Sequence, residues 1–183
     1  MKWGTVGADE LSATLWRERR QIDFLLFLLE TQLLHLKAGN WHRLNFTASE
    51  LEKVLENLRF ESLARGVEAS ALAAEWKAPD HFSLPALISI APPGIWPELL
   101  EDHRGGMVAL LTAIDDAVAA NLALLAGSTD PEPGPSLSRS DGPGLSGDPD
   151  DLAHLTRDAN IQRAAAATRG ASLPTLRDFL GLA

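Results

Sequence analysis

The first half of the chain is dominated by one long apolar helix that has more than one apolar side. A leucine or isoleucine recurs every seven residues, at Leu15, Ile22, Leu29 and Leu36. This spacing places the four side chains on one side of an α-helix with 3.6 residues per turn. A second apolar set lies well off that side and comprises Phe24, Phe27, Leu28 and Leu34. Because one neighbouring helix covers one stripe, we expect at least two partners, whether helices of this chain, a second copy or a foreign helix.

Two long helices separated by a two-residue break form a predicted hairpin. The first helix is expected over about residues 9–38, and Gly39-Asn40 supplies left-handed residues that end it at low cost. The second helix is expected from Trp41 to about Trp76, and Pro79 disfavours a helical residue before it. A break this short forces the two helices to lie antiparallel.

The remainder of the chain divides by composition into three parts. Ser83 and Pro85 predict a short capped helix, and a third long helix is expected over about residues 96–126, with a kink or weak point at Gly105-Gly106. We therefore predict an all-α bundle over residues 1–126. Residues 127–149 are rich in Gly, Pro, Ser and Asp, which predicts a disordered linker. Residues 150–183 are expected to form a C-terminal helix and an apolar tail, whose larger side chains include Leu152, Leu155, Leu176, Phe179 and Leu180.

Composition excludes several classes of function. The 183 residues contain no cysteine, which excludes disulfide scaffolds and thiolate-ligated metal sites. A net charge of -9 argues against a nucleic-acid-binding surface, which would need clustered Lys and Arg. The longest unbroken apolar run, Phe24 to Leu29, is far shorter than the roughly 20 residues that span a bilayer. The first residues show no apolar signal core. We expect a cytoplasmic chain that does not insert into membranes.

No arrangement of residues in the sequence supports catalysis. Carboxylate-bundle metal sites need Glu-x-x-His pairs, and the chain has none. His35 and His103 fall on helix stripes, where a hydrogen-bonded histidine is the ordinary interpretation. The Gly142-x-Gly144-x-x-Gly147 pattern follows no strand and lies in linker sequence, so it does not predict a dinucleotide site. We predict a protein that is not an enzyme and uses no metal or cofactor.

Several short stretches together resemble the FlgN family of flagellar export chaperones, particularly the type found in high-GC Gram-positive bacteria. They are Leu15-Trp-Arg-Glu-Arg-Arg-Gln-Ile-Asp-Phe-Leu-Leu-Phe-Leu-Leu-Glu30, Leu36-Lys-Ala-Gly-Asn40 and Leu51-Glu-Lys-Val-Leu-Glu56. The leucine-containing segment near Ala86, the Pro92–Trp96 turn, the third helix and the ending Ser172-Leu-Pro-Thr-Leu-Arg-Asp-Phe-Leu180 also fit that type.

The resemblance implies a cytosolic chaperone of the flagellar type III export system. Such a protein holds the hook-associated proteins of the hook–filament junction unpolymerised and delivers them to the export apparatus. It implies recognition between helices, largely through the C-terminal region of the chaperone and an amphipathic C-terminal segment of the client.

The residues suggest a compatible mechanism. We expect the hairpin and the third helix to form a groove near Phe24, Phe27, Leu28 and Leu34, with the apolar tail covering apolar surface until a client helix displaces it or packs beside it. Two alternatives remain open. The third helix and the C-terminal helix would bury the second stripe as ordinary core, or the chain would be a structural or regulatory protein that dimerises through that stripe. A chaperone is expected to be a monomer or a weak dimer.

Overall fold

The computed structural model describes residues 6–80, 82–128 and 149–182, and every element in these ranges is helical, which confirms the predicted all-α fold. The predicted linker lies outside the described residues from 129 to 148. The long helices are α1 (Val6–Lys37), α2 (Leu44–Glu75), α4 (Trp96–Gly127) and α5 (Pro149–Arg169). The short elements are η1 (Trp41–Arg43), α3 (Leu84–Ile90), η2 (Gly170–Ser172) and α6 (Pro174–Leu180).

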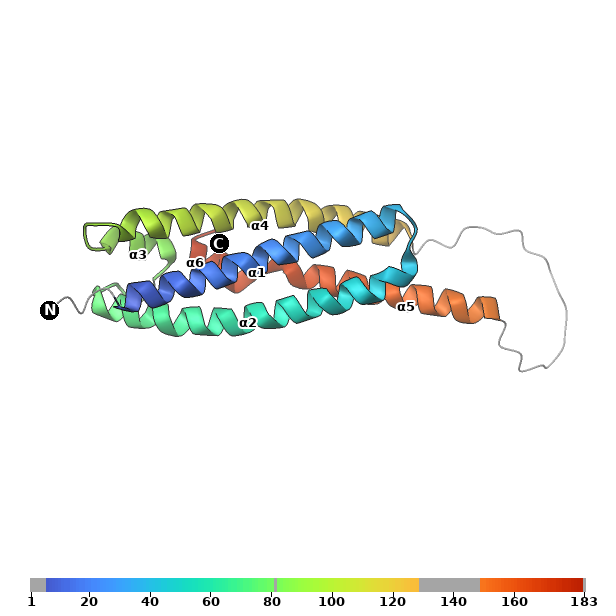
Figure 1. The fold of residues 1–183 in the computed structure, drawn as a ribbon, viewed down its shortest axis with the longest axis horizontal. Coiled ribbons are helices and arrows are strands. Elements are labelled where there is room, and N and C mark those ends of the chain that lie inside the picture. Colours follow the sequence, from blue (N-terminus) through green and yellow to red (C-terminus); the bar gives the residue numbers. More distant parts are fainter. Residues whose placement is uncertain (1–5, 81, 129–148, 183) are drawn as a thin grey trace.

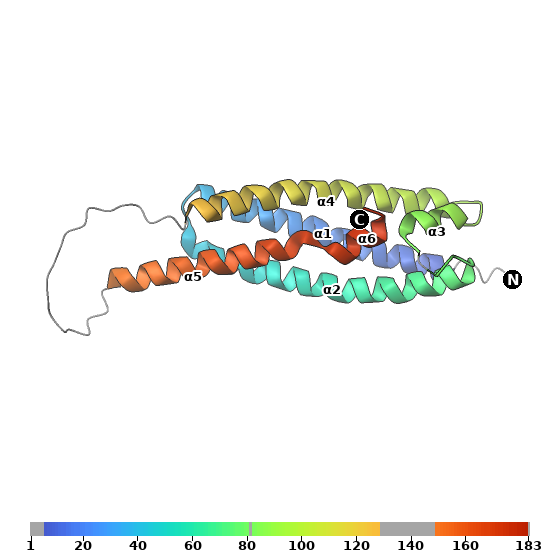
Figure 2. The same ribbon diagram turned by 180° about the vertical axis from the view of Figure 1, so that it is seen from behind.

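The four long helices form an elongated bundle with alternating direction along the chain (Figure 1). Helix α1 packs against α2 and α4, and α5 packs against the same two helices, so α1 and α5 lie diagonally opposite each other. The view from behind shows α5 between α2 and α4 (Figure 2). The short helices α6 and α3 lie toward the end of the bundle that is opposite the α1–α2 turn. The C-terminal segment 150–183, which the sequence sets apart by composition, thus contributes the fourth helix of the same bundle.

The turn between α1 and α2 is closed by backbone hydrogen bonds. The Asn40 N–H donates to the His35 carbonyl at 2.9 Å and the Gly39 N–H to the Leu36 carbonyl at 3.2 Å, with Gly39 at φ +70°. The predicted break is therefore in the right place, but Asn40 has φ -83° and is not left-handed. Helix α1 also begins earlier than predicted, at Val6, and η1 precedes the α-helical part of the second helix.

A layer of polar side chains crosses the apolar core near the α1–α2 turn and takes one residue from each long helix. The Gln32 amide donates to the Asn121 carbonyl oxygen at 3.0 Å and to the Thr168 hydroxyl at 2.9 Å. The Thr47 hydroxyl donates to the Gln32 oxygen at 3.4 Å. All four side chains are buried, and a buried amide without partners costs about 1–3 kcal/mol. The layer therefore favours one register of the four helices over others.

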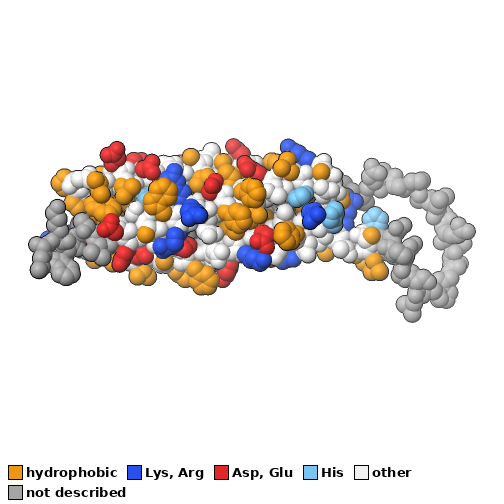
Figure 3. All heavy atoms as spheres, viewed as in Figure 1, with side chains coloured by type: hydrophobic (Ala, Val, Ile, Leu, Met, Phe, Trp, Pro, Cys, Tyr) orange, Lys and Arg blue, Asp and Glu red, His pale blue; other side chains and the backbone are white. Residues whose placement is uncertain are grey.

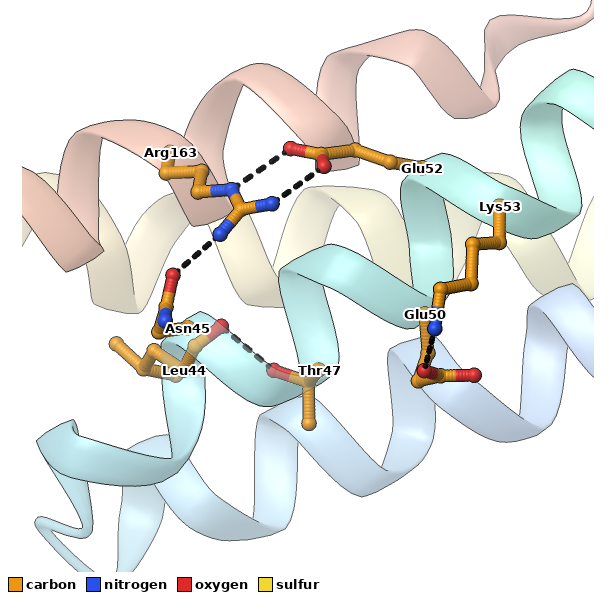
Figure 4. A network of polar contacts seen from close by, with 7 residues as sticks. All are labelled: Leu44, Asn45, Thr47, Glu50, Glu52, Lys53 and Arg163. Carbon is orange, nitrogen blue, oxygen red and sulfur yellow. Dashed lines mark hydrogen bonds and ion pairs between the residues drawn. The ribbon is translucent and has the colours of Figure 1, made fainter.

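Polar contacts on the outside attach α5 to α2 (Figure 4). The Arg163 guanidinium donates to both carboxylate oxygens of Glu52, at 2.9 and 2.6 Å, and to the side-chain oxygen of Asn45. The hydrogen bond from Arg163 lowers the pKa of Glu52. Because both side chains are more than a third exposed, solvent screens this pair and its contribution to stability is small.

Helix α4 runs without interruption through Gly105 and Gly106, so the predicted weak point is absent from this helix. A Cβ at residue 106 would lie 2.2 Å from the Arg19 guanidinium carbon, so Gly106 allows Arg19 to cross from α1 and pair with Asp102 at 3.3 Å. His103 is fully buried and hydrogen-bonds the Ser12 hydroxyl at 3.0 Å, which confirms the expected structural histidine.

Helix α4 is also long and apolar enough to cross a membrane by length and composition alone, with a mean hydropathy of 1.8 in its most apolar stretch. A core helix of a bundle passes the same test when it is mostly buried, and 22% of this stretch is buried. Asn121 of α4 donates to the Leu29 carbonyl of α1 at 2.9 Å, and His103 bonds to Ser12 of α1 as well. These contacts are typical of a core helix, and the absence of membrane insertion stays a prediction.

Candidate functional site

The outward side of α1 carries large apolar side chains that the bundle leaves uncovered. These residues, which we call the α1 face, are Trp16, Phe24, Phe27 and Leu34, with exposed fractions of 48%, 43%, 57% and 67%. They lie opposite the heptad leucines, which are buried against α2 and α4. Figure 3 shows hydrophobic side chains along this side of the molecule, mixed with both signs of charge. Several large exposed apolar side chains on one side of a helix indicate a candidate interaction site.

The two central phenylalanines of the α1 face stack on each other. The rings of Phe24 and Phe27 have centroids 6.0 Å apart and an interplanar angle of 14°. Both side chains project from the middle of a 32-residue helix that packs against α2 and α4, so the backbone that carries them is held in place before binding.

A groove between α1 and α2 adjoins the α1 face near the turn of the hairpin. This hairpin groove has a volume of about 380 Å³, and its walls include Phe27, Leu28, Thr31 and His35 of α1 and Phe46 and Glu50 of α2. Phe46 is 67% exposed and extends the apolar surface onto α2. Leu28 is buried and forms part of the floor.

The predicted position of this groove is therefore partly wrong. The sequence places it between the hairpin and the third helix, whereas the structure forms it between the two helices of the hairpin. Helix α4 occupies the other flank of α1, where Arg19 pairs with Asp102. The alternative that α4 and α5 bury the second stripe is also wrong for Phe24, Phe27 and Leu34, because α5 lies diagonally across the core from α1.

The apolar tail packs far from the α1 face, on the side of the bundle where α5 lies between α2 and α4. Leu176 and Leu180 are buried in the core, and Phe179 is partly buried beneath the Arg65 guanidinium, 4.9 Å from its ring centroid. Arg177 pairs with Asp115 of α4 at 2.6 Å. The tail thus covers apolar surface as predicted, but it covers the core and not Phe24 or Phe27.

The two remaining predicted residues lie on a third surface. Leu152 and Leu155 are 61% and 65% exposed on the N-terminal half of α5, which extends past the α1–α2 turn (Figure 1). The Arg157 guanidinium lies 4.4 Å from the Trp41 ring centroid, which ties this half of α5 to η1. The nine predicted residues therefore fall into three groups: the α1 face with its groove, the projecting part of α5, and the buried tail.

The sequence analysis missed a second groove, of about 490 Å³, between α2 and the C-terminal segment. Its walls include Leu55, Leu58 and Leu63 of α2 and Leu173 and Leu176 of the tail, and Glu18 of α1 lies at its floor. Glu18 forms a buried ion pair with Arg65, and both side chains are 2% exposed. Burial raises the pKa of Glu18 despite the opposing charge of Arg65. One sequence signal for the pair exists, since Glu18 stands at a core position between Leu15 and Ile22.

Within the described ranges, no group of three or more His, Asp or Glu side chains is arranged to hold a metal ion. No known protein family, curated protein or solved structure matches the chain at a significant level. The chemistry of the surfaces is therefore the basis for assigning a role. Apolar faces and grooves at the surface of a helical bundle are suited to binding another protein segment.

Proposed function

We propose that the protein is an export chaperone that binds hook-associated proteins of the bacterial flagellum, keeps them unpolymerised and delivers them to the export apparatus. The observation that carries the proposal is the uncovered α1 face beside the hairpin groove. The exposed aromatic side chains of the α1 face and the apolar walls of the hairpin groove together form a surface that an amphipathic helix can bind. The choice of client rests on the resemblance of most of residues 9–126 and of the tail to the FlgN family.

The C-terminal region contributes to the same end of the molecule. The hairpin groove is lined by Asn40 and Arg43 of the turn, and the projecting half of α5 with Leu152 and Leu155 extends beyond that turn. The groove and the projecting half of α5 are separate surfaces at this end, and each carries exposed apolar side chains that a client segment can contact. This arrangement supports recognition that includes the C-terminal region of the chaperone, as the family resemblance implies.

Titration calorimetry with synthetic C-terminal peptides of the hook-associated proteins encoded in the same genome tests the proposal. The wild-type chain is expected to bind at least one peptide. The double variant Phe24→Ser/Phe27→Ser is expected to weaken binding by about tenfold or more, because a buried phenylalanine contributes roughly 1.5–3 kcal/mol. The double variant Leu152→Ser/Leu155→Ser tests the projecting half of α5, and it is expected to weaken peptide binding as well.

A matched control uses two exposed apolar residues of another surface. Phe60 and Val67 are 63% and 72% exposed on α2, so Phe60→Ser/Val67→Ser changes the surface to a similar extent. The proposal fails if no peptide binds, or if the control weakens binding as much as the α1 variants do. Deleting residues 150–183 is a poor substitute, because it removes Ile161, Leu176 and Leu180 from the core.

A further inference from the structure

The groove between α2 and the C-terminal segment has at its floor a buried polar atom without a partner. We call this groove the tail groove, and its apolar walls include Leu55, Leu58, Leu63, Leu173, Pro174 and Leu176. The Glu18 side chain at its floor is 2% exposed. Oε1 of Glu18 accepts a hydrogen bond from Arg65, whereas no donor among the described residues bonds to Oε2. Buried polar atoms are rarely left without a partner, so this oxygen requires an explanation.

The size and lining of the tail groove are typical of a small-molecule site. Its volume of about 490 Å³ lies within the roughly 300–1,000 Å³ of such sites. These sites combine apolar walls with a few polar groups that orient the ligand. In the tail groove the polar groups are the Glu18 carboxylate and the hydroxyls of Ser62 and Thr175.

The backbone of the tail is unusual where it forms the wall of the groove. Leu173 has φ +46°, a left-handed conformation that a residue with a Cβ rarely adopts. Gly170 lies so close to α2 that a Cβ there would be 2.8 Å from the Leu55 Cδ1 atom. Strained backbone occurs preferentially at binding sites, although the free oxygen of Glu18 is the stronger observation.

The charges at the groove indicate which kind of ligand fits. Both charged residues that line it are already paired, Glu18 with Arg65 and Arg59 with Glu56. An ionic ligand would therefore lack a counter-charge, whereas Oε2 of Glu18 can accept a further hydrogen bond. Burial raises the pKa of Glu18, as expected for a carboxylate with too few donors to replace its water.

We propose that the tail groove binds an uncharged, mainly apolar small molecule that donates one hydrogen bond from a hydroxyl or N–H group to Oε2 of Glu18. The walls would bury the apolar body of the ligand, and Glu18 would fix its orientation. This inference goes beyond the proposed function and does not depend on it, because the tail packs far from the α1 face.

Two flat aromatic probes of similar shape test the requirement for a donor. Indole has an N–H group, whereas benzothiophene has no donor. Each is titrated into the isotope-labelled full chain at pH 8, which favours the ionised carboxylate, and amide chemical shifts report both affinity and location. Indole is expected to bind about tenfold more tightly than benzothiophene, because a hydrogen bond to a charged group is among the stronger ones. The largest shifts are expected near Ser62 and Gly170.

Glu18→Gln tests the acceptor itself. The amide oxygen can still accept from Arg65, but an NH₂ group replaces the free oxygen. This variant is expected to weaken indole binding by about tenfold and to leave benzothiophene binding unchanged.

A second pair of variants leaves the buried ion pair intact. Leu63→Asp puts a charge on the groove wall, and Val67→Asp puts the same charge about one turn further along α2, outside the groove. Both residues are more than two-thirds exposed, so neither change disturbs the core. Leu63→Asp is expected to weaken both probes, and Val67→Asp is expected to affect neither.

The inference is overturned if indole does not bind, if the shifts cluster on the α1 face, or if benzothiophene binds the wild-type chain as tightly as indole does. Equal effects of Leu63→Asp and Val67→Asp would also overturn it. Should Glu18→Gln fail to fold, the two probes on the wild-type chain and the two aspartate variants decide the question. Saturating indole is expected to leave client-peptide binding unchanged, so each proposal can fail without the other.

Discussion

The buried ion pair between Glu18 and Arg65 gives the sharpest test of how this bundle is held together. Both side chains are 2% exposed, and Arg65 also donates to the Ser62 hydroxyl at 3.1 Å. Glu18→Ala leaves the guanidinium buried with that hydroxyl and the Phe179 ring as its remaining neighbours. Removing one member of a buried pair costs about 3–5 kcal/mol, so urea denaturation should show a loss of this size. The double variant Glu18→Leu/Arg65→Met should be near wild type, because it removes both charges together.

An exposed pair between the same two helices provides the control. Arg17 and Glu61 approach to 3.3 Å, with side chains 53% and 24% exposed, so Glu61→Ala should cost less than about 1 kcal/mol. If Glu18→Ala costs no more than Glu61→Ala, the reasoning about buried charge is wrong.

The same pair predicts a pH dependence in the variant that lacks the arginine. Burial and the nearby Glu61 raise the pKa of Glu18, and Arg65 opposes them. In Arg65→Ala the opposing influence is gone, so the pKa of Glu18 rises further. A folded-state pKa above the unfolded value favours the folded state at low pH and is a penalty at high pH. The loss of stability caused by Arg65→Ala should therefore be smaller at pH 5 than at pH 7.5, and an equal loss at both would contradict the argument.

Two further predictions concern α4. Burial, with a smaller contribution from Arg19, lowers the pKa of His103, so its contribution to stability is present above the unfolded pKa near 6.5 and is lost as pH falls. Urea midpoints at pH 7.5, 6.5 and 5.5 should decline in the wild type and decline less in His103→Gln; parallel curves would refute this. Gly105 has open space around its Cβ position, so Gly105→Ala should raise the free energy of unfolding by about 0.5–1 kcal/mol. Gly106→Ala should gain less because it displaces Arg19, and calorimetric melting that shows equal gains would contradict the close approach.

The parts of the fold that depend on local sequence were predictable. The seven-residue spacing from Leu15 gives the buried side of α1, and Gly39 ends that helix where its lack of a Cβ permits a positive φ. Ser83 accepts a hydrogen bond from the Ala86 N–H at 3.4 Å, as its predicted capping position requires. Each of these features involves residues within a few positions of one another, so periodicity and turn chemistry are sufficient to locate them.

Features that join distant segments were not predictable. Glu18 and Arg65 are far apart in sequence, and each alone resembles a solvated charge on a helix. Gln32 and Thr168 likewise become partners only after α5 has taken its place beside α2 and α4. The candidate site shows the same limit, because the second stripe was identified from residue spacing, whereas its exposure depends on α5 packing diagonally opposite α1.

The hydrogen bond between Gln32 and Thr168 also has a consequence for synthesis of the chain. Gln32 and Thr168 are separated by 136 positions. Nearly the whole polypeptide must therefore leave the ribosome before the Gln32 amide can form this hydrogen bond. Until then, α1, α2 and α4 can assemble into an open trough whose leucines face water. A nascent chain truncated before Ile161 should consequently be recruited by general chaperones, and the finished one released from them.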